Sequence, residues 1–143
     1  MEIRPITPRY AVSPQITVED VPAIAAAGFV KVICNRPNVE VPPAMQSDAI
    51  GQAVRDAGMV FEVLELTHQT MTPENVARQR DMAESEGGPV LAYCASGTRC
   101  SVVWALGQCD HLSPDEILEA TGKAGYALDN LRPALDQLSQ RDG

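Results

Sequence analysis

The sequence predicts an α/β fold, a single domain over residues 1–143 with a mainly parallel central sheet flanked by helices. Short apolar runs alternate with longer segments of helical periodicity, and strands separated by helices form parallel sheets. One run, Val90 to Tyr93, ends at a cysteine that is followed by small residues and then by an arginine. We therefore expect a ligand loop at the carboxyl end of a strand, where open α/β folds bind ligands.

The composition is that of an ordinary globular domain. With 143 residues, the chain is long enough to form one hydrophobic core without metal ions or disulfides. Its net charge of -8 leaves no basic surface for phosphates, so we expect neither nucleic acid nor an anionic membrane as a partner. The amino terminus lacks the apolar core of a signal peptide, and no apolar run is long enough to span a bilayer. These features predict a cytoplasmic protein.

Caps, breakers and periodicity predict the elements before the central run. Thr17 and Asp20 resemble a capping box, and Pro73 stands at the first position of a later helix. Alternating apolar positions indicate a strand in which Phe61 and Val63 point the same way. In chain order we expect an edge strand at 6–12, a helix from 17 to 28, a buried strand at 29–34, a helix from 47 to 58, a strand at 59–66 and a helix from 73 to 87.

Three helices are expected after the central run. The first begins at Thr98 or just after it and ends at His111, and Ser113 begins the second. Leucines at helical spacing predict the third over 126–138, where Pro133 indicates a break or a late start.

The loop between the central strand and the next helix is suited to binding an anion. Unpaired amides of the first helical turn can converge on a bound oxyanion, and Gly97 permits the positive φ that turns amides inward. The same helix end favours the thiolate of Cys94, and Arg99 adds a full charge and a planar fork. We therefore expect Cys94 to be a nucleophile. The expected anion ligands are Arg99 and the backbone amides of Ala95, Ser96, Gly97 and Thr98.

The segment CASGTRCS, Cys94 to Ser101, resembles the anion loop of the cysteine-based phosphatase superfamily. Together with VICNRP at 32–37 and PVLAYC at 89–94, it resembles more closely the phosphatase-like family found beside beta-lactamase-like hydrolase domains. The resemblance implies a cysteine-phosphatase-like fold over most of the chain. It also implies a hydrolase that acts on a phosphate substrate through a covalent thiol intermediate. Counted from the cysteine, Ser101 falls where the phosphatase hydroxyl stabilises the leaving thiolate.

Departures from the usual phosphatase signature keep other functions open. Tyr93 replaces the histidine before the cysteine, and the loop is one residue short, so Cys100 stands where the arginine is expected. The short loop also resembles that of rhodaneses, in which a cysteine carries a sulfane sulfur as a persulfide. A sulfurtransferase acting on a sulfur-oxyanion substrate is therefore an alternative, and an inactive anion-binding module is a third.

Three further residues are candidates for the site. Arg36 follows a neighbouring strand and could face the same anion, although a surface ion pair is an equal alternative. His68 is the one group suited to proton transfer in the loop 67–71, where the superfamily normally has an aspartate. Cys100 is a candidate resolving cysteine for an oxidised Cys94, with an inert thiol as the simpler interpretation. The cysteines and histidines lack metal-ligand spacing, so neither a metal nor another cofactor is expected.

Overall fold

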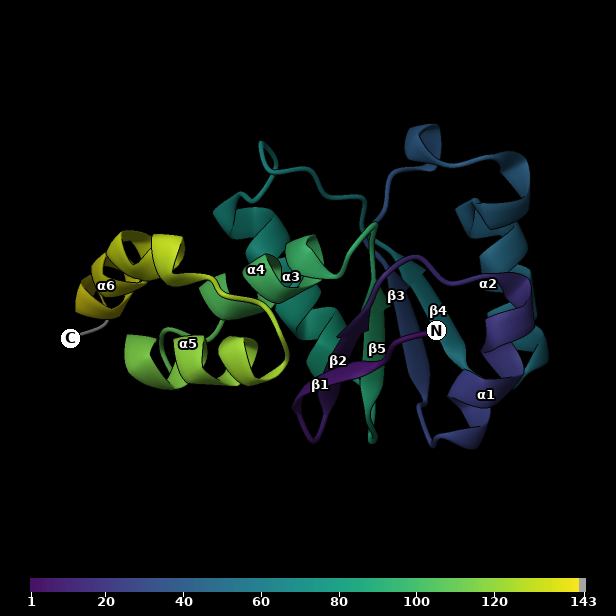
Figure 1. Cartoon of the computed structure of the whole chain (residues 1–143), viewed down its shortest axis with the longest axis horizontal. Helices are drawn as coiled ribbons and strands as arrows, with labels where there is room; N and C mark the ends of the chain where they lie inside the picture. The colour runs from purple at the N-terminus through teal and green to yellow at the C-terminus, as the bar shows by residue number, and fades with distance from the viewer. Residues whose placement is uncertain (142–143) are drawn as a thin grey trace.

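A five-stranded sheet in the order β1-β2-β5-β3-β4 forms the centre of the computed structural model, which describes residues 1–141 (Figure 1). The strands are β1 (Arg4–Thr7), β2 (Tyr10–Ser13), β3 (Lys31–Cys34), β4 (Val60–Val63) and β5 (Val90–Tyr93). All neighbours pair in parallel except β1 and β2, which form an antiparallel hairpin. The predicted α/β fold with a mainly parallel sheet is confirmed, and β5, the strand that immediately precedes Cys94, is the central one.

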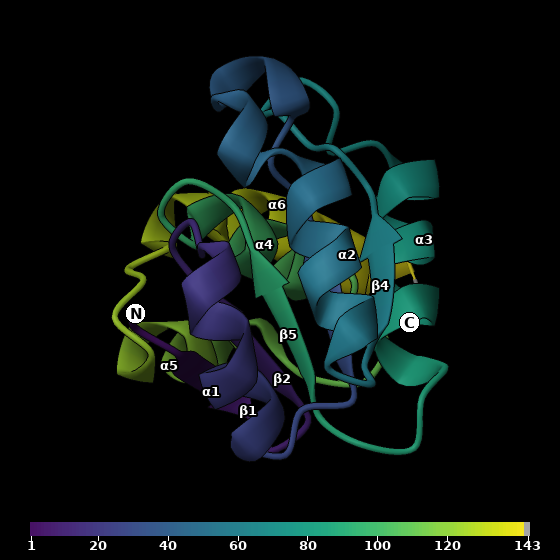
Figure 2. The same ribbon diagram turned by 90° about the vertical axis from the view of Figure 1, so that its right-hand side faces the viewer.

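Helices cover both faces of the sheet (Figure 1, Figure 2). They are α1 (Val21–Ala26), α2 (Ser47–Asp56), α3 (Pro73–Glu84), α4 (Thr98–Leu106), α5 (Pro114–Lys123) and α6 (Arg132–Arg141). Helices α1 and α2 lie on one face, while α3 and α4 lie on the other, with α5 and α6 packed beyond α4. None of the helices in residues 1–141 has the length and apolar character needed to cross a membrane.

Strand β5 contributes to two apolar cores because successive side chains of a strand point to opposite faces. Leu91 and Tyr93 pack in the core beneath α1 and α2, whereas Val90 and Ala92 pack in the core beneath α4 and α5. Helix α4 is buried from Cys100 to Ala105, as expected for a helix enclosed by the sheet and by other helices. Its position is therefore fixed, and so is the loop that precedes it.

The expected edge strand at 6–12 is instead the hairpin of β1 and β2. Thr7 causes the reversal, because its hydroxyl oxygen accepts the backbone N–H groups of Arg9 and Tyr10 at 3.1 and 3.0 Å. Pro8, which has no N–H to donate to a sheet, stands in the same turn. The hairpin places β2, not β1, beside the central strand.

Other boundaries shift by a few residues. Helix α4 ends at Leu106 rather than His111, because Gly107 follows and the chain continues in turns. In β4, Phe61 is buried but Val63 is 40% exposed, so the face that these two residues share is only partly covered. The first helix is split into a 3-10 turn and the short α1, and the last α-helix starts late, as Pro133 indicated.

Candidate active site

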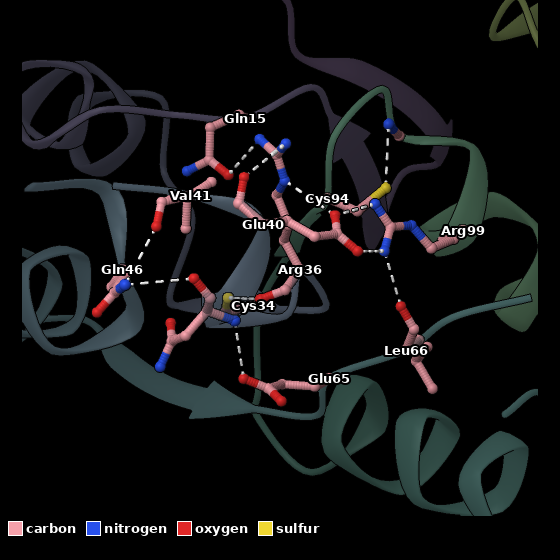
Figure 3. Close-up of polar contacts among 12 residues, drawn as sticks. Gln15, Cys34, Arg36, Glu40, Val41, Gln46, Glu65, Leu66, Cys94 and Arg99 are labelled. Carbon is pink, nitrogen blue, oxygen red and sulfur yellow. Dashed lines mark hydrogen bonds and ion pairs between the residues drawn. The ribbon is translucent and has the colours of Figure 1, made fainter. Parts of the chain in front are cut away.

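The loop 94–97 connects β5 to α4 at the carboxyl edge of the sheet. Gly97 is the N-cap of α4 and has a φ of 93°, the left-handed conformation expected from the sequence. Cys94 is fully buried beside the first turn of the helix, and the Gly97 N–H donates to its Sγ at 3.2 Å (Figure 3). The first turn of α4 therefore encloses the sulfur, as the predicted anion nest requires.

The surroundings of Cys94 favour its thiolate. The Cys100 thiol and the backbone amides of Cys100, Gly97 and Ser96 bond to the sulfur, and they lower the pKa of Cys94 to about 5 although burial acts in the opposite direction. Burial, followed by the neighbouring Cys94 sulfur, raises the pKa of Cys100, so Cys100 is the proton-donating member of the pair. Burial also raises the pKa of Cys34. The expected reactive cysteine thus has the electrostatic setting of a nucleophile.

Three carbonyl groups of the loop, and one in the first turn of α4, accept hydrogen bonds from other parts of the chain or from α4. Ala95 O accepts the Gln15 N–H at 3.3 Å, Ser96 O accepts Tyr126 Oη at 2.8 Å, Gly97 O accepts Ser101 Oγ at 2.8 Å, and Cys100 O accepts Tyr10 Oη at 2.9 Å. Because the N–H and C=O of a trans peptide point in opposite directions, holding the carbonyls outward holds the amides inward. The nest is thus fixed by Gln15, Tyr126 and Tyr10, which are distant in the sequence, and by the nearby Ser101.

Ser101 takes part in this bracing. Its side chain is fully buried, and its hydroxyl donates to the Gly97 carbonyl rather than to the Cys94 sulfur. In this arrangement the side chain that bonds to the sulfur is the Cys100 thiol, beside the Gly97 N–H. The expected role of Ser101 toward a leaving thiolate would require its hydroxyl to rotate away from Gly97.

Arg99 is fixed by two acceptors. Its Nη1 and Nη2 donate to the carboxylate oxygens of Glu40 at 2.9 and 2.8 Å, and Nη1 also donates to Leu66 O at 2.9 Å (Figure 3). These bonds leave the Nε–H and the second Nη2–H, on one edge of the guanidinium, without an acceptor among the described residues. That edge has the fork geometry that binds two oxygens of an anion.

Glu40 is held between two arginines. Arg36 Nε donates to the same carboxylate at 3.2 Å, and Arg36 Nη1 donates to Gln15 Oε1 at 3.3 Å (Figure 3). The guanidinium of Arg99 and then that of Arg36 lower the pKa of Glu40 against the effect of burial. Arg36 therefore contacts the site through Glu40. Glu65 holds the segment 38–40 that contains Glu40, because its carboxylate accepts the Asn38 N–H at 3.0 Å.

Glu40 is the residue that the sequence reasoning missed. Its local signal is weak, since it stands four positions after Arg36 in a proline-rich loop, a spacing typical of a surface ion pair. Only the fold brings it to Arg99, 59 positions further along the chain.

His68 is not brought to the sulfur. It is exposed in the turn after β4, and no contact in the described part of the chain joins it to Cys94 or Arg99. The same strand extension nevertheless reaches the site at Leu66, two positions earlier. Across residues 1–141, no group of three or more His, Cys, Asp or Glu side chains could hold a metal ion.

Comparison with known sequences identifies relatives over most of the chain. The family described as "Beta-lactamase hydrolase-like protein, phosphatase-like domain" matches residues 2–111. A beta-lactamase hydrolase-like protein of Agrobacterium fabrum is 34% identical over 104 residues, which cover 72% of this chain and 24% of that protein. The chain thus spans about a quarter of the length of this curated relative.

Solved structures share the fold. The structure of a candidate phosphatase from Neisseria meningitidis aligns with a TM-score of 0.86 at 33% identity, covering 96% of this chain and 99% of that one. TpbA of P. aeruginosa, solved in complex with pTyr, aligns with a TM-score of 0.66 at 18% identity, covering 98% and 89% of the two chains. The predicted phosphatase-like fold is confirmed.

Proposed function

Because the chain belongs to the phosphatase-like domain family of beta-lactamase hydrolase-like proteins, we propose that it is a cysteine-dependent phosphatase acting on phosphate monoesters. The observation that carries the proposal is the Cys94 sulfur, buried among backbone amides at the start of α4, with a lowered pKa and the open edge of Arg99 in the same site. A thiolate, an oxyanion nest and a positioned guanidinium are the groups that a phosphoryl transfer to sulfur requires.

In the first step, the Cys94 thiolate attacks phosphorus, an S–P bond forms, and the P–O bond to the leaving group breaks. The amides of residues 95–99 and the Nε and Nη2 donors of Arg99 stabilise the charge on the non-bridging oxygens. In the second step, water attacks phosphorus, the S–P bond breaks, phosphate leaves, and the thiolate re-forms. The Cys100 thiol can donate to the departing sulfur and so assist this second step.

Protonation of the leaving oxygen is the weak part of this mechanism. Glu40 lies nearest to Arg99, but both arginines hold its pKa below the ordinary range, which favours the carboxylate over the acid. His68, the other candidate donor, is exposed in a turn. Without a positioned acid, rates should fall steeply as the leaving group becomes more basic. We therefore propose aryl phosphates as the preferred class, and the pTyr bound to TpbA makes phosphotyrosine a reasonable probe.

A side-by-side assay tests the proposal. The reduced protein is supplied with an aryl phosphate, with an alkyl phosphate, and with thiosulfate plus cyanide, and Cys94→Ser serves as the blank. We expect Cys94-dependent phosphate release from the aryl ester, much slower release from the alkyl ester, and no thiocyanate. Thiocyanate without phosphate would instead indicate a sulfurtransferase, and inactivity in every assay would indicate an anion-binding module. Either result would refute the proposed function.

A further inference from the structure

We propose that Tyr126 is a positioning residue that holds the anion loop in its binding shape. Tyr126 follows α5 and precedes the 3-10 turn η4 (Asp129–Leu131), so it lies outside the residues 2–111 that the family description covers. It is 8% exposed and belongs to the same apolar core as Cys94. The carboxyl-terminal helices would then complete the active site rather than only pack against it.

Two contacts connect Tyr126 to the loop. Its hydroxyl donates to the Ser96 carbonyl at 2.8 Å. Its ring and hydroxyl also lie directly against Gly97, so closely that a methyl group on Gly97 would overlap the Tyr126 hydroxyl. Tyr126 therefore contacts both residues that flank the 96–97 peptide bond.

The peptide bond between Ser96 and Gly97 connects Tyr126 to the Cys94 sulfur. The Ser96 carbonyl and the Gly97 N–H belong to one planar trans unit, so they point in opposite directions. Tyr126 holds the carbonyl on one side, while on the other side the Gly97 N–H donates to the Cys94 sulfur at 3.2 Å. Glycine resists rotation of this peptide less than other residues do, because it tolerates both signs of φ. The Tyr126 hydroxyl supplies the restraint that glycine lacks.

Tyr126 is itself held by contacts with Arg4 and with the end of α5. The Arg4 guanidinium of β1 lies over its ring, 5.3 Å from the centroid, and Arg4 Nη1 donates to Ala124 O at 3.3 Å. The Tyr126 backbone N–H donates to Thr121 O at 2.9 Å. Strand β1 and helix α5 thus hold the ring in place, and a rigid support is what a positioning residue needs.

The test compares Tyr126→Phe with Tyr93→Phe. Both changes remove one buried tyrosine hydroxyl, but that of Tyr93 faces only the weakly accepting sulfur of Cys34. Two quantities are measured for each variant: inhibition of turnover by inorganic phosphate, and the pH midpoint of Cys94 alkylation. Thermal unfolding is followed in parallel to show that the comparison is made on folded protein.

For Tyr126→Phe we expect about fivefold weaker phosphate inhibition, the effect of losing one hydrogen bond of ordinary strength. The alkylation midpoint should rise by about half a pH unit or more, since Gly97 N–H no longer faces the sulfur. The other titratable groups that act on Cys94, namely Cys100, Arg99, Tyr10 and Cys34, are unchanged in the variant. Tyr93→Phe should match the parent in both measurements.

If phosphate inhibition for Tyr126→Phe stays within about twofold of the parent and the alkylation midpoint within about 0.3 pH unit, differences worth only ~0.4 kcal/mol each, Tyr126 is a core residue and the inference is wrong. If Tyr126→Phe does not fold, Arg4→Gln is measured instead, and it should shift both quantities in the same direction by a smaller amount. Of the two measurements, only the inhibition of turnover depends on the proposed function. A shifted alkylation midpoint in a protein that hydrolyses no phosphate ester would support the role of Tyr126 and refute the phosphatase.

Discussion

Replacement of Glu40 by glutamine should impair phosphate turnover although Glu40 bears the wrong charge to bind phosphate. The carboxylate accepts from both Nη1 and Nη2 of Arg99, whose side chain is only 11% exposed. Glutamine keeps the shape but offers a single oxygen, and its amide group cannot accept from the second nitrogen. Arg99 would then lose the contact that directs its open edge toward the anion.

The magnitude follows from the bond that is lost. A hydrogen bond to a charged group contributes about 1.5–3 kcal/mol, and the partial exposure of Glu40, 32%, reduces this to about 1–2 kcal/mol. At about 1.4 kcal/mol per factor of ten, kcat/KM for an aryl phosphate should fall about five- to thirtyfold. Removing a negative charge from the site should offset little of this loss, because Arg36 and Arg99 already neutralise Glu40.

Steady-state kinetics on an aryl phosphate check this prediction, with Glu65→Gln as the matched control. Glu65 lies on the same side of the site, but its carboxylate accepts only a backbone N–H, that of Asn38. The control should therefore retain kcat/KM within about threefold of the parent, corresponding to ~0.6 kcal/mol. An unchanged or increased kcat/KM in Glu40→Gln would mean that Glu40 blocks Arg99 instead of orienting it, and the reasoning would fail.

Three further predictions concern the loop. Arg99→Lys keeps the charge but loses the fork, so phosphate affinity and turnover should both drop by about tenfold or more with the fold intact, as measured by inhibition and circular dichroism. The lowered pKa of Cys94 predicts that kcat/KM rises with pH through a midpoint near 5. It also predicts that the thiolate's contribution to the free energy of unfolding is complete above the usual pKa of 9.0 and is lost as the pH falls toward 5. In urea unfolding, Cys94→Ser should lack this pH-dependent contribution. Gly97→Ala should be more destabilising than Gly28→Ala. Both residues have a positive φ, which costs alanine about 1–2 kcal/mol, but of the two only Gly97 has another side chain, that of Tyr126, where the methyl group would lie.

The sequence could predict the elements that depend on local signals. An apolar run before Cys94, a glycine at the required turn and an arginine at the helix start are neighbours in the chain, so their geometry follows from helix and strand rules. The late start of α6 follows in the same way from Pro133. The hairpin at Thr7 was missed because a side-chain oxygen, which periodicity ignores, stabilises the reversal.

The supports of the site could not be predicted, because they depend on tertiary packing. Glu40 reaches Arg99 across 59 positions, and Tyr126 reaches Ser96 across 30. Each is an ordinary residue in its own segment, and its partner is determined by how α2, α4 and α5 pack on the sheet. Ser101 illustrates the same limit, since its position predicts a hydroxyl near the sulfur while its actual acceptor is the Gly97 carbonyl.

The central claim is that the Cys94 sulfur attacks phosphorus, and the phosphorylated enzyme tests it most directly. The reduced protein is mixed with an aryl phosphate, quenched in acid within the first turnover, digested and analysed by mass spectrometry. We predict one added phosphoryl group on the peptide that contains Cys94, formed together with a burst of the released phenol and absent in Cys94→Ser. Turnover that proceeds with no phosphoryl group on Cys94, or that persists in Cys94→Ser, would contradict the account.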